Sequence, residues 1–362
     1  MQYLAILGRK AEISIAELEA LFQNVQKIAP SLAIFKSDNP PDITRLGGSL
    51  KIAKKLEVAV IEHLSNIPDG KITFGVSDYS KNASPRSAFS EAMKIKKILT
   101  RHGRSVRIVT GKDATLSTAT SLHNGLSGKN PKKCELIKRG NDWYQVIGVQ
   151  DIDAYSRRDQ ARPFRDAKVG MLPPKLAQIL INLCGPLKSD ATVLDPFCGT
   201  GVVLQEALLM GYTAYGTDVN ERMIEYSEKN LKHFDFSNFK LAVGDATNYK
   251  WTEKIDAVAC EGYLGAPMST PPAEIKLKEQ KQICGDIVLG FLKNLSTQIK
   301  PNTPVAIAIP AWLREDGTYS RLEIVDEIKN MGYNVNNKSL GGLLYYREGQ
   351  IVARDIIILR KV

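Results

Sequence analysis

The segment Val193–Gly201, which reads VLDPFCGTG, constrains the fold of this chain more than any other stretch. The apolar residues Ala191–Leu194 are typical of a buried strand, and the acid Asp195 follows them directly. A turn bracketed by Gly199 and Gly201 comes next, and apolar residues then recur with helical spacing. Strand, tight turn and helix start in this order are typical of the ligand-binding edge of an open α/β sheet.

This glycine turn differs from the motifs that bind dinucleotides or phosphates. Leu204 stands where the dinucleotide motif needs a third glycine, and the chain contains no G-x-x-x-x-G-K-[ST] sequence. An acid placed just before the glycines suits a cationic group better than a pyrophosphate. Because S-adenosyl-L-methionine carries an ammonium and a sulfonium, the turn favours this cofactor over NAD or FAD.

Two further acids follow apolar segments downstream. Asp218 ends the segment 214–218, at the place where a ribose diol would lie, and Asp245 follows the segment 241–243, where a carboxylate can accept from an adenine amino group. One acid at such a place is more often a helix cap. Three acids in this order, each after an apolar strand, indicate a nucleoside-binding edge.

The sequences D-P-F-C-G-T-G, G-T-D and G-D-A together resemble the class I S-adenosylmethionine-dependent methyltransferases. With the upstream segment 170–177 (GMLPPKLA), they resemble more narrowly the THUMP-domain tRNA (guanine-10-N2)-methyltransferases, and this resemblance covers nearly the whole chain. It implies that the cofactor is bound by Pro173, Asp195, Pro196, Cys198, Gly199, Thr200, Gly201, Asp218, Val219, Asp245 and Ala246.

The order of the expected elements predicts an α/β fold. Strands alternating with helices, followed by an antiparallel tail, predict a doubly wound, seven-stranded Rossmann-like methyltransferase sheet over 171–362, with a helix over 321–331 and a closing hairpin over 333–359. The resemblance implies an N-terminal α+β part, with a ferredoxin-like region over 1–50, a THUMP RNA-binding domain over 51–150 and a linker over 151–170. Ser14–Glu17 predicts a helix that starts with a capping box.

The positive charge of the chain is confined to its first part. Residues 1–150 carry 23 Lys and Arg against 13 Asp and Glu, whereas residues 151–362 carry 26 of each. We interpret this split as a polyanion-binding surface beside a neutral catalytic domain, the alternative being an ordinary basic surface. In the resembling family this part holds the acceptor end of tRNA, which implies phosphate contacts from Arg104, Arg107, Lys112, Lys129, Lys132 and Lys133.

Two other basic segments have simpler alternatives. A helix expected over 89–102 carries four cations that point in different directions, so it is either part of the RNA surface or a solvated face. Residues 151–169 contain four arginines and four aspartates, which suits a salt-bridged linker. Within that segment, Arg157 and Arg162 either contact RNA or lock the domains together.

The chemistry is expected after the fourth strand of the sheet, at Glu261, Gly262 and Tyr263. Methyltransferases of exocyclic amines have D-P-P-Y or N-P-P-Y at this place. The amine of a guanine is a poor nucleophile, because its lone pair is delocalised into the ring. A side-chain oxygen and a backbone carbonyl accept its two N–H bonds and localise the lone pair, while an aromatic ring stacks on the base.

This chain departs from that pattern, because Glu261 replaces the expected Asp or Asn and Gly262 replaces the first proline. Glutamate is longer by one methylene, and glycine loses the fixed φ of proline. Three interpretations remain: a re-tuned active site, an altered substrate, or a protein that binds the cofactor without catalysis. The alternatives to a tRNA guanine-N2 methyltransferase are thus a tRNA-binding protein with a degenerate motif and an adenine-N6 nucleic-acid methyltransferase.

Composition restricts the remaining classes. The five cysteines and four histidines show no ligand spacing, so we expect no metal and no disulfides, and we expect a reducing, cytoplasmic location. No apolar run is long enough to span a membrane, and residues 1–10 are unlike a signal peptide. The expected partner is tRNA, and an activating protein subunit stays open.

Overall fold

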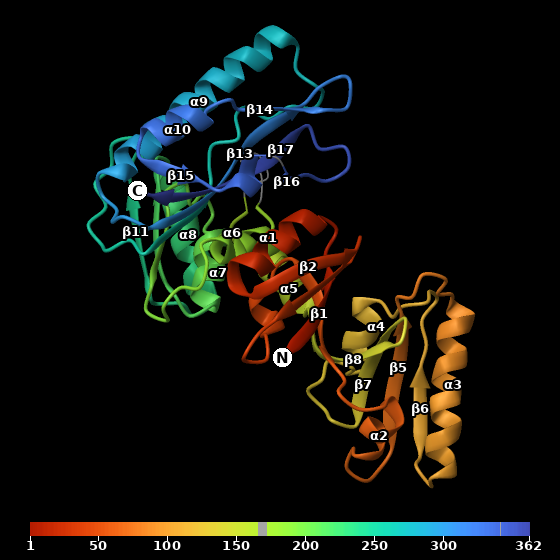
Figure 1. The fold of residues 1–362 in the computed structure, drawn as a ribbon. Coiled ribbons are helices and arrows are strands. Elements are labelled where there is room, and N and C mark those ends of the chain that lie inside the picture. Colours follow the sequence, from red (N-terminus) through yellow and green to blue (C-terminus); the bar gives the residue numbers. More distant parts are fainter. Residues whose placement is uncertain (166–171, 341) are drawn as a thin grey trace. The chain divides into compact units, whose positions relative to one another are not determined.

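The computed structural model describes residues 1–165, 172–340 and 342–362. These residues form two compact units, Met1–Ala154 and Tyr155–Val362, which we describe one at a time (Figure 1). The predicted contributions of Asp166, Gly170 and Met171, together with the predicted boundary between linker and catalytic domain, lie outside the described residues.

The first unit contains one eight-stranded sheet in the order β2-β3-β1-β4-β8-β7-β5-β6. Its elements are β1 (Gln2–Leu7), α1 (Ala11–Leu21), β2 (Gln23–Ala29), β3 (Leu32–Lys36), a 3₁₀ turn (Ile43–Arg45), β4 (Ser49–Lys55), α2 (Val60–Ser65), β5 (Ile72–Asp78), α3 (Pro85–Arg101), β6 (Val106–Val109), α4 (Thr118–His123), β7 (Lys133–Arg139) and β8 (Asp142–Val149). Strand β4 pairs with both β1 and β8, so the sheet is continuous across residue 50. The division of this unit into a ferredoxin-like region and a THUMP domain stays a prediction.

A buried ion pair holds the middle of this sheet. The Lys51 ammonium on β4 donates to both carboxylate oxygens of Glu135 on β7, at 2.7 and 2.8 Å. Ser77 on β5 and Ser121 on α4 also donate to that carboxylate. Burial lowers the pKa of Lys51, and the Glu135 charge opposes that shift. The network therefore ties four elements together through one carboxylate that water does not reach.

The helix start predicted at Ser14–Glu17 is wrong. Helix α1 begins at Ala11, and Ser14 and Glu17 lie inside it. Their side chains serve a distant loop: Ser14 donates to the Gly48 carbonyl at 2.7 Å, and Glu17 accepts the Gly47 and Gly48 N–H groups at 2.9 and 2.8 Å. The serine–glutamate spacing thus holds the glycine turn before β4.

Strand β2 and helices α2 and α5 are among the elements that the sequence did not predict. Strand β2 is an exposed edge strand, so it lacks the apolar alternation that marks a buried strand. Helix α2 has only six residues. Helix α5 (Ile152–Gln160) lies within the predicted linker. Short and edge elements bury few side chains, which is why their sequences carry weak signals.

The second unit is built on a nine-stranded sheet with the main order β11-β10-β9-β12-β13-β17-β15. Its remaining elements are α6 (Pro174–Leu183), β9 (Thr192–Asp195), α7 (Val202–Leu209), β10 (Thr213–Asp218), α8 (Glu221–His233), β11 (Phe239–Val243), β12 (Ala257–Glu261), α9 (Glu274–Ser296), β13 (Pro304–Leu313), β14 (Tyr319–Arg321), α10 (Val325–Asn330), β15 (Tyr333–Val335), a 3₁₀ turn (Asn337–Leu340), β16 (Leu344–Tyr345) and β17 (Val352–Lys361). Strands β9 to β13 pair in parallel and β17 is antiparallel. The predicted doubly wound seven-stranded sheet is confirmed, with β14 and β16 as additions.

The two faces of this sheet bury different side chains. Leu194, Val258 and Ile307 pack into a core with α9. Their neighbours along the strands alternate to the other face, where α6, α7 and α8 contact the sheet (Figure 1). Asp195 and Glu261 end their strands on this second face, as the alternation requires.

Two predictions for the C-terminal part need correction. The helix expected over 321–331 is strand β14 followed by the short helix α10, because Arg321 pairs with Ala311 as a β-strand residue. The hairpin expected over 333–359 is an antiparallel pair of β15 with β17, with a 3₁₀ turn and β16 between them. No described helix is both long and apolar enough to cross a membrane.

We expect Lys51→Met to lower the free energy of unfolding of the first unit by about 3–5 kcal/mol, because it leaves the Glu135 carboxylate buried without its cation. Chemical denaturation followed by circular dichroism measures this change. Hydrogen exchange of peptides from β4 and β7 assigns it to the first unit.

Lys55→Met is the matched control on the same strand. Lys55 pairs with Asp142 at 2.9 Å, with both side chains more than a third exposed, so its loss should cost about 0–1 kcal/mol. Equal destabilisation by the two variants would contradict the structural role of the Lys51–Glu135 pair.

Candidate functional site

A cavity of about 570 Å³ opens at the carboxyl ends of the parallel strands in the second unit. We call it the acidic cavity. Four short segments supply most of its walls, and each begins at or after the end of a strand. It is lined by Leu172, Asp195, Pro196, Phe197, Cys198, Gly199, Thr200, Val202, Val203, Asp218, Val219, Asn220, Met223, Gly244, Asp245, Ala246, Thr247, Glu261, Gly262, Tyr263, Leu264, Gly265, Pro267 and Ile287.

The two glycines of the turn after β9 have different tasks. Gly199 has a φ of +49°, and a Cβ built on it would meet no atom closer than 4.0 Å, so the cavity lies directly against its backbone. Gly201 has a φ of +84°, and a Cβ there would lie 2.9 Å from the Ser227 hydroxyl oxygen on α8. The backbone of Gly199 is therefore open to a ligand, whereas the missing side chain of Gly201 allows α8 to pack closely.

Hydrogen bonds fix the shape of this turn. The Gly199 N–H donates to one carboxylate oxygen of Asp218 at 2.9 Å, and the Asn220 N–H donates to the other at 2.9 Å. The Ser227 hydroxyl donates to the Gly199 carbonyl at 2.8 Å. The Phe197 N–H donates to Asp195 at 3.1 Å. The ends of β9 and β10 are thus joined into one rigid rim.

Four carboxyl groups line the acidic cavity: Asp195, Asp218, Asp245 and Glu261. No lysine, arginine or histidine of the described residues lines it. Burial raises the pKa of Asp195 well above its ordinary value, with the nearby Asp218 and Glu261 charges adding to the effect. Burial also raises the pKa of Asp218. A cation placed here would offset these costs, so the cavity is suited to a positively charged ligand.

The structure brings most of the predicted cofactor residues together. All of them line the acidic cavity except Pro173 and Gly201. Pro173 is the N-cap of α6, directly after the lining residue Leu172, and Gly201 is the N-cap of α7. Thr247 was not predicted, although its spacing from Asp245 is a signal: its N–H and hydroxyl both donate to the Asp245 carboxylate, at 2.9 and 2.8 Å. Ile287, which comes from α9, had no local signal.

The three residues predicted for chemistry lie at one side of the acidic cavity. Glu261 ends β12, and its carboxylate accepts a hydrogen bond from Arg354 of β17, a partner that the sequence did not indicate. The Gly262 N–H donates to the Ala308 carbonyl at 2.9 Å, a bond that the proline of D-P-P-Y cannot make. Tyr263 is 44% exposed and follows the acid by two residues, whereas the aromatic residue of D-P-P-Y follows it by three.

The predicted phosphate contacts of the first unit lie at different ends of its parallel strands, because Lys112 follows the carboxyl end of β6 whereas Lys133 begins β7. The parallel register places Thr73 of β5 beside both Arg107 of β6 and Lys133 of β7. Arg107, Lys112, Lys129 and Lys133 are exposed, and Lys132 is half-buried. Arg104 is held by the preceding loop, because its guanidinium donates to Asp69, Ile67 and Pro68. Arg104 is therefore less available to a phosphate than the four exposed residues.

The two arginines predicted in the linker differ in exposure. Arg157 is exposed on α5. Arg162 is only 3% exposed, and its guanidinium donates to the Thr200 hydroxyl at 3.0 Å, so it lies beneath the surface that phosphate contacts need. Its neighbour Arg158 pairs with buried Glu206 at 2.9 Å. Ion pairing within the second unit thus accounts for part of this charged segment.

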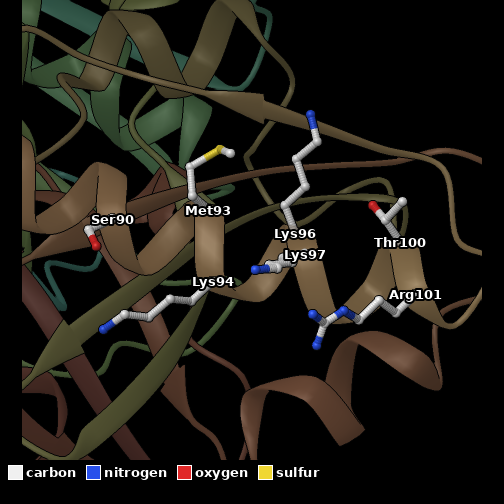
Figure 2. A pocket seen from close by; sticks show the side chains of 7 residues that line it. All are labelled: Ser90, Met93, Lys94, Lys96, Lys97, Thr100 and Arg101. Carbon is white, nitrogen blue, oxygen red and sulfur yellow. The ribbon is translucent and has the colours of Figure 1, made fainter.

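The outer face of α3 carries a cationic stripe that the sequence alone left undecided. Lys94, Lys97 and Arg101 are spaced to lie on one side of the helix and are exposed. They border a shallow hollow together with Met93 and Thr100 (Figure 2). We call Lys94, Lys97 and Arg101 the α3 stripe. Exposed apolar side chains lie along the same helix, namely Phe89, Met93 and Ile98.

We expect the affinity for S-adenosylmethionine to fall on acidification, because the cationic ligand needs an ionised Asp195. A raised pKa means that this carboxyl takes up its proton at a higher pH than an ordinary aspartate, whose pKa is about 4. Calorimetric titrations between pH 8 and pH 5 measure the effect. Asp195→Asn should weaken binding about 10- to 100-fold at pH 8 and reduce the pH dependence.

Asp190→Asn is the control, since Asp190 is exposed on the loop before β9. It should bind the cofactor as the parent protein does. An affinity that is constant from pH 8 to pH 5, or unchanged binding by Asp195→Asn, would contradict the assignment.

Curated relatives are similar to part of the chain. The tRNA (guanine(10)-N2)-dimethyltransferase of Methanothermobacter thermautotrophicus is 40% identical over 114 residues, which are 31% of this chain and 34% of that protein. Proteins of the same name from Pyrococcus abyssi and Methanocaldococcus jannaschii are 35% and 31% identical over 118 and 155 residues, covering 32% and 41% of this chain and 34% and 40% of theirs. The chain thus spans about a third of the length of the first two relatives. These names confirm the resemblance predicted from the motifs.

A solved structure and two family models are also similar to this chain. The crystal structure of TrmN from Thermus thermophilus is 16% identical, covers 100% of both chains and gives a TM-score of 0.48. A model described as a DNA methylase matches residues 130–229, and one described as a methyltransferase domain matches residues 187–330. The cofactor predicted for such a domain is S-adenosylmethionine. The chain therefore contains a methyltransferase domain and is similar, over about a third of its length, to tRNA (guanine(10)-N2)-dimethyltransferases.

Proposed function

We propose that this protein transfers a methyl group from S-adenosylmethionine to the exocyclic N2 amine of a guanosine in tRNA, at position 10. One observation carries the proposal: the acidic cavity joins the glycine turn and strand-end acids directly to Glu261 and Tyr263. A cofactor site and an amine-accepting group in one cavity are what methyl transfer to a base amine requires. The names of the curated relatives supply the position and the nucleic acid.

The residues of the acidic cavity match the parts of the cofactor. Asp195 and Asp218 provide the negative charge for its ammonium and sulfonium and for its ribose hydroxyls. Asp245 lies where it can accept from the adenine amino group. The open backbone at Gly199 allows close approach. When bound, S-adenosylmethionine supplies an activated methyl group and a neutral leaving group.

The protein's own contribution to the reaction is orientation. The Glu261 carboxylate accepts one N–H of the guanine amine, and the Gly262 carbonyl accepts the other. Both acceptors are held by the sheet, since Glu261 ends β12 and the Gly262 N–H is bonded to Ala308 of β13. Tyr263 stacks on the base and fixes its plane. The guanosine must leave its helical stack to enter, as in other enzymes that modify bases.

The first unit supplies the affinity for tRNA. Residues 1–150 hold the whole positive excess of the chain, and Arg107 and Lys133 flank Thr73 of β5 on either side. The α3 stripe extends this basic character along a helix in which Glu91 is the only acid, bound to Lys94 at 2.8 Å. Exposed Phe89 and Met93 beside the stripe offer surfaces on which bases can stack.

A second candidate is methylation of adenine N6 in DNA. The match of residues 130–229 to a DNA methylase model favours it, and the amine chemistry is the same. Competition of duplex DNA and tRNA for binding to the protein separates the two candidates. Preference for DNA would transfer the proposal to this second activity.

Incubation of the protein with a tRNA transcript and tritiated S-adenosylmethionine should label guanosine at position 10. A transcript in which that guanosine is replaced by adenosine is the control and should stay unlabelled. Digestion to nucleosides and mass spectrometry identify the product. Absence of label in the unaltered transcript, in the presence of measured cofactor binding, would contradict the proposed reaction.

Replacing the α3 stripe by glutamine (K94Q, K97Q and R101Q together) should weaken tRNA binding and reduce its dependence on salt. Each lost phosphate contact removes about 0.7–0.9 from the slope of log K against log salt, so we expect the slope to decrease by about 2. Binding isotherms recorded at salt concentrations between about 50 and 300 mM measure this slope.

The matched control is K276Q, K278Q and K293Q, three exposed lysines of helix α9 in the second unit. These changes remove the same charge from the chain. If both triple variants lower the slope equally, the effect is one of net charge, and the α3 stripe is not a specific contact.

A further inference from the structure

The carboxylate of Glu261 is bound by an arginine from a distant part of the chain. Arg354 Nε donates to Glu261 Oε1, and 93 positions separate the two residues. The Arg354 side chain is 5% exposed and that of Glu261 is 15% exposed. An ion pair between two such buried side chains is costly to desolvate and needs good geometry to persist. Because this ion pair lies at the wall of the acidic cavity, we expect it to have a function there.

The sheet explains how the two side chains meet. Glu261 of β12 stands beside Ala308 of β13, and Arg354 of β17 stands beside Pro310 of β13. Residues paired across strands point to the same face, so all four share one face of the sheet. Two strand spacings, about 9.6 Å, separate the backbones of β12 and β17. Ala308 and Pro310 of β13, which lie between the two strands, have short side chains. The longer side chains of Glu261 and Arg354 can therefore meet above them.

The neighbouring residue of β17 shows that this pairing is selective. Asp355 follows Arg354 and therefore points to the opposite face, where Arg321 of β14 donates to it at 2.7 Å. Arg354 and Asp355 cannot bind each other. Each is instead matched to a partner of opposite charge on its own face. This arrangement also provides a comparable ion pair outside the acidic cavity.

The distance across β13 explains the glutamate that departs from D-P-P-Y. Aspartate at position 261 would be shorter by one methylene, about 1.3 Å, and its carboxylate would remain closer to the β12 backbone. Glutamate reaches Arg354 with one oxygen. Oε2 takes no hydrogen bond from the described residues and is left for a ligand. The longer side chain can thus bind Arg354 through Oε1 and a ligand through Oε2.

The charges around Glu261 make such a partner necessary. Asp195 of β9 and the Cys260 thiol are the titratable groups that its charge affects, and burial together with nearby carboxylates raises the pKa of both. Arg354 is the cation that faces this group of acids from β17. Without it, the Glu261 carboxylate would lie near Asp195 with no cationic partner among the described residues.

We propose that Arg354 is a positioning residue that fixes the direction of the Glu261 carboxylate, with Oε1 anchored and Oε2 presented to the substrate amine. This inference rests on the proposed function, and it explains why the acid is a glutamate. The pair replaces the rigid backbone of D-P-P-Y, since Gly262 provides no fixed φ. Here a side-chain anchor does what proline does in that motif.

The kinetic test compares Arg354→Met and Arg354→Lys with Arg321→Met. Arg354→Met should lower kcat for tRNA methylation about 10- to 100-fold, as removal of a charge-assisted hydrogen bond does. KM for tRNA and the affinity for S-adenosylmethionine should change less than about threefold. The acid limb of its pH–rate profile should move to higher pH, because a carboxylate that loses a neighbouring cation favours its neutral form. Lysine should restore part of kcat.

Arg321→Met breaks the other ion pair of β17, on the opposite face. It should leave the position of the acid limb unchanged when assayed below its unfolding temperature. An unchanged limb in Arg354→Met, or an equal shift in Arg321→Met, overturns the positioning role, since a merely structural arginine would not move the limb selectively.

A second measurement needs no activity. The Arg354 Nε–H should give a slowly exchanging signal in a ¹⁵N–¹H spectrum, assigned by its disappearance in Arg354→Lys. Glu261→Asp should lose this protection and should methylate more slowly than the parent protein, although it restores the acid of D-P-P-Y. Retained protection or full activity in Glu261→Asp overturns the inference. Absence of methylation by the parent protein overturns the proposed function instead, and the exchange result still decides the pairing.

Discussion

Parallel pairing of β9, β10, β11 and β12 decides where every acid of the site lies. The register sets Gly216 beside Asp195 and Asp218 beside Val243, so the strands end at nearly the same level. Each acid follows or ends a strand, and the chain then leaves the sheet through a turn. The carboxylates therefore converge at one edge although they are far apart in sequence. A shift of one residue in β9, β10 or β12 would turn its acid toward the α9 core.

Burying several carboxylates in the acidic cavity has an electrostatic cost, which a cationic ligand would offset. Burial raises the pKa of Asp195 and Asp218, because their ionised forms are less favourable there than in water. A cationic ligand recovers this energy on binding. The negative charge of Glu261 is instead paired with Arg354 of the same chain. Among the described residues, Glu261 thus has a cationic partner, whereas Asp195 and Asp218 accept only from backbone N–H groups.

The first unit also pairs a buried carboxylate with a buried cation. Lys51 and Glu135 are nearly fully buried and satisfy each other, while Ser77 and Ser121 fill the remaining acceptor positions of the carboxylate. Its other cations, including Arg107 and the α3 stripe, lie outside, where they favour a polyanion. One sheet therefore separates a cation that stabilises the fold from those that are available for binding.

The sequence by itself determined the doubly wound sheet, the glycine turn and the order of the strand-end acids, because these depend on local backbone geometry and on apolar runs that neighbours in sequence reveal. It could not determine the partner of Glu261, since Arg354 reaches it only after β17 has paired with β13 and the alternation of side chains has chosen a face. Ser14 and Glu17 show the same limit: their spacing is that of a capping box, but Gly47 and Gly48 compete for them in the folded chain. Edge strand β2 and the β14–α10 segment also escaped the sequence, because few buried side chains mark them. Contacts between segments distant in sequence, and not local propensity, decided these features.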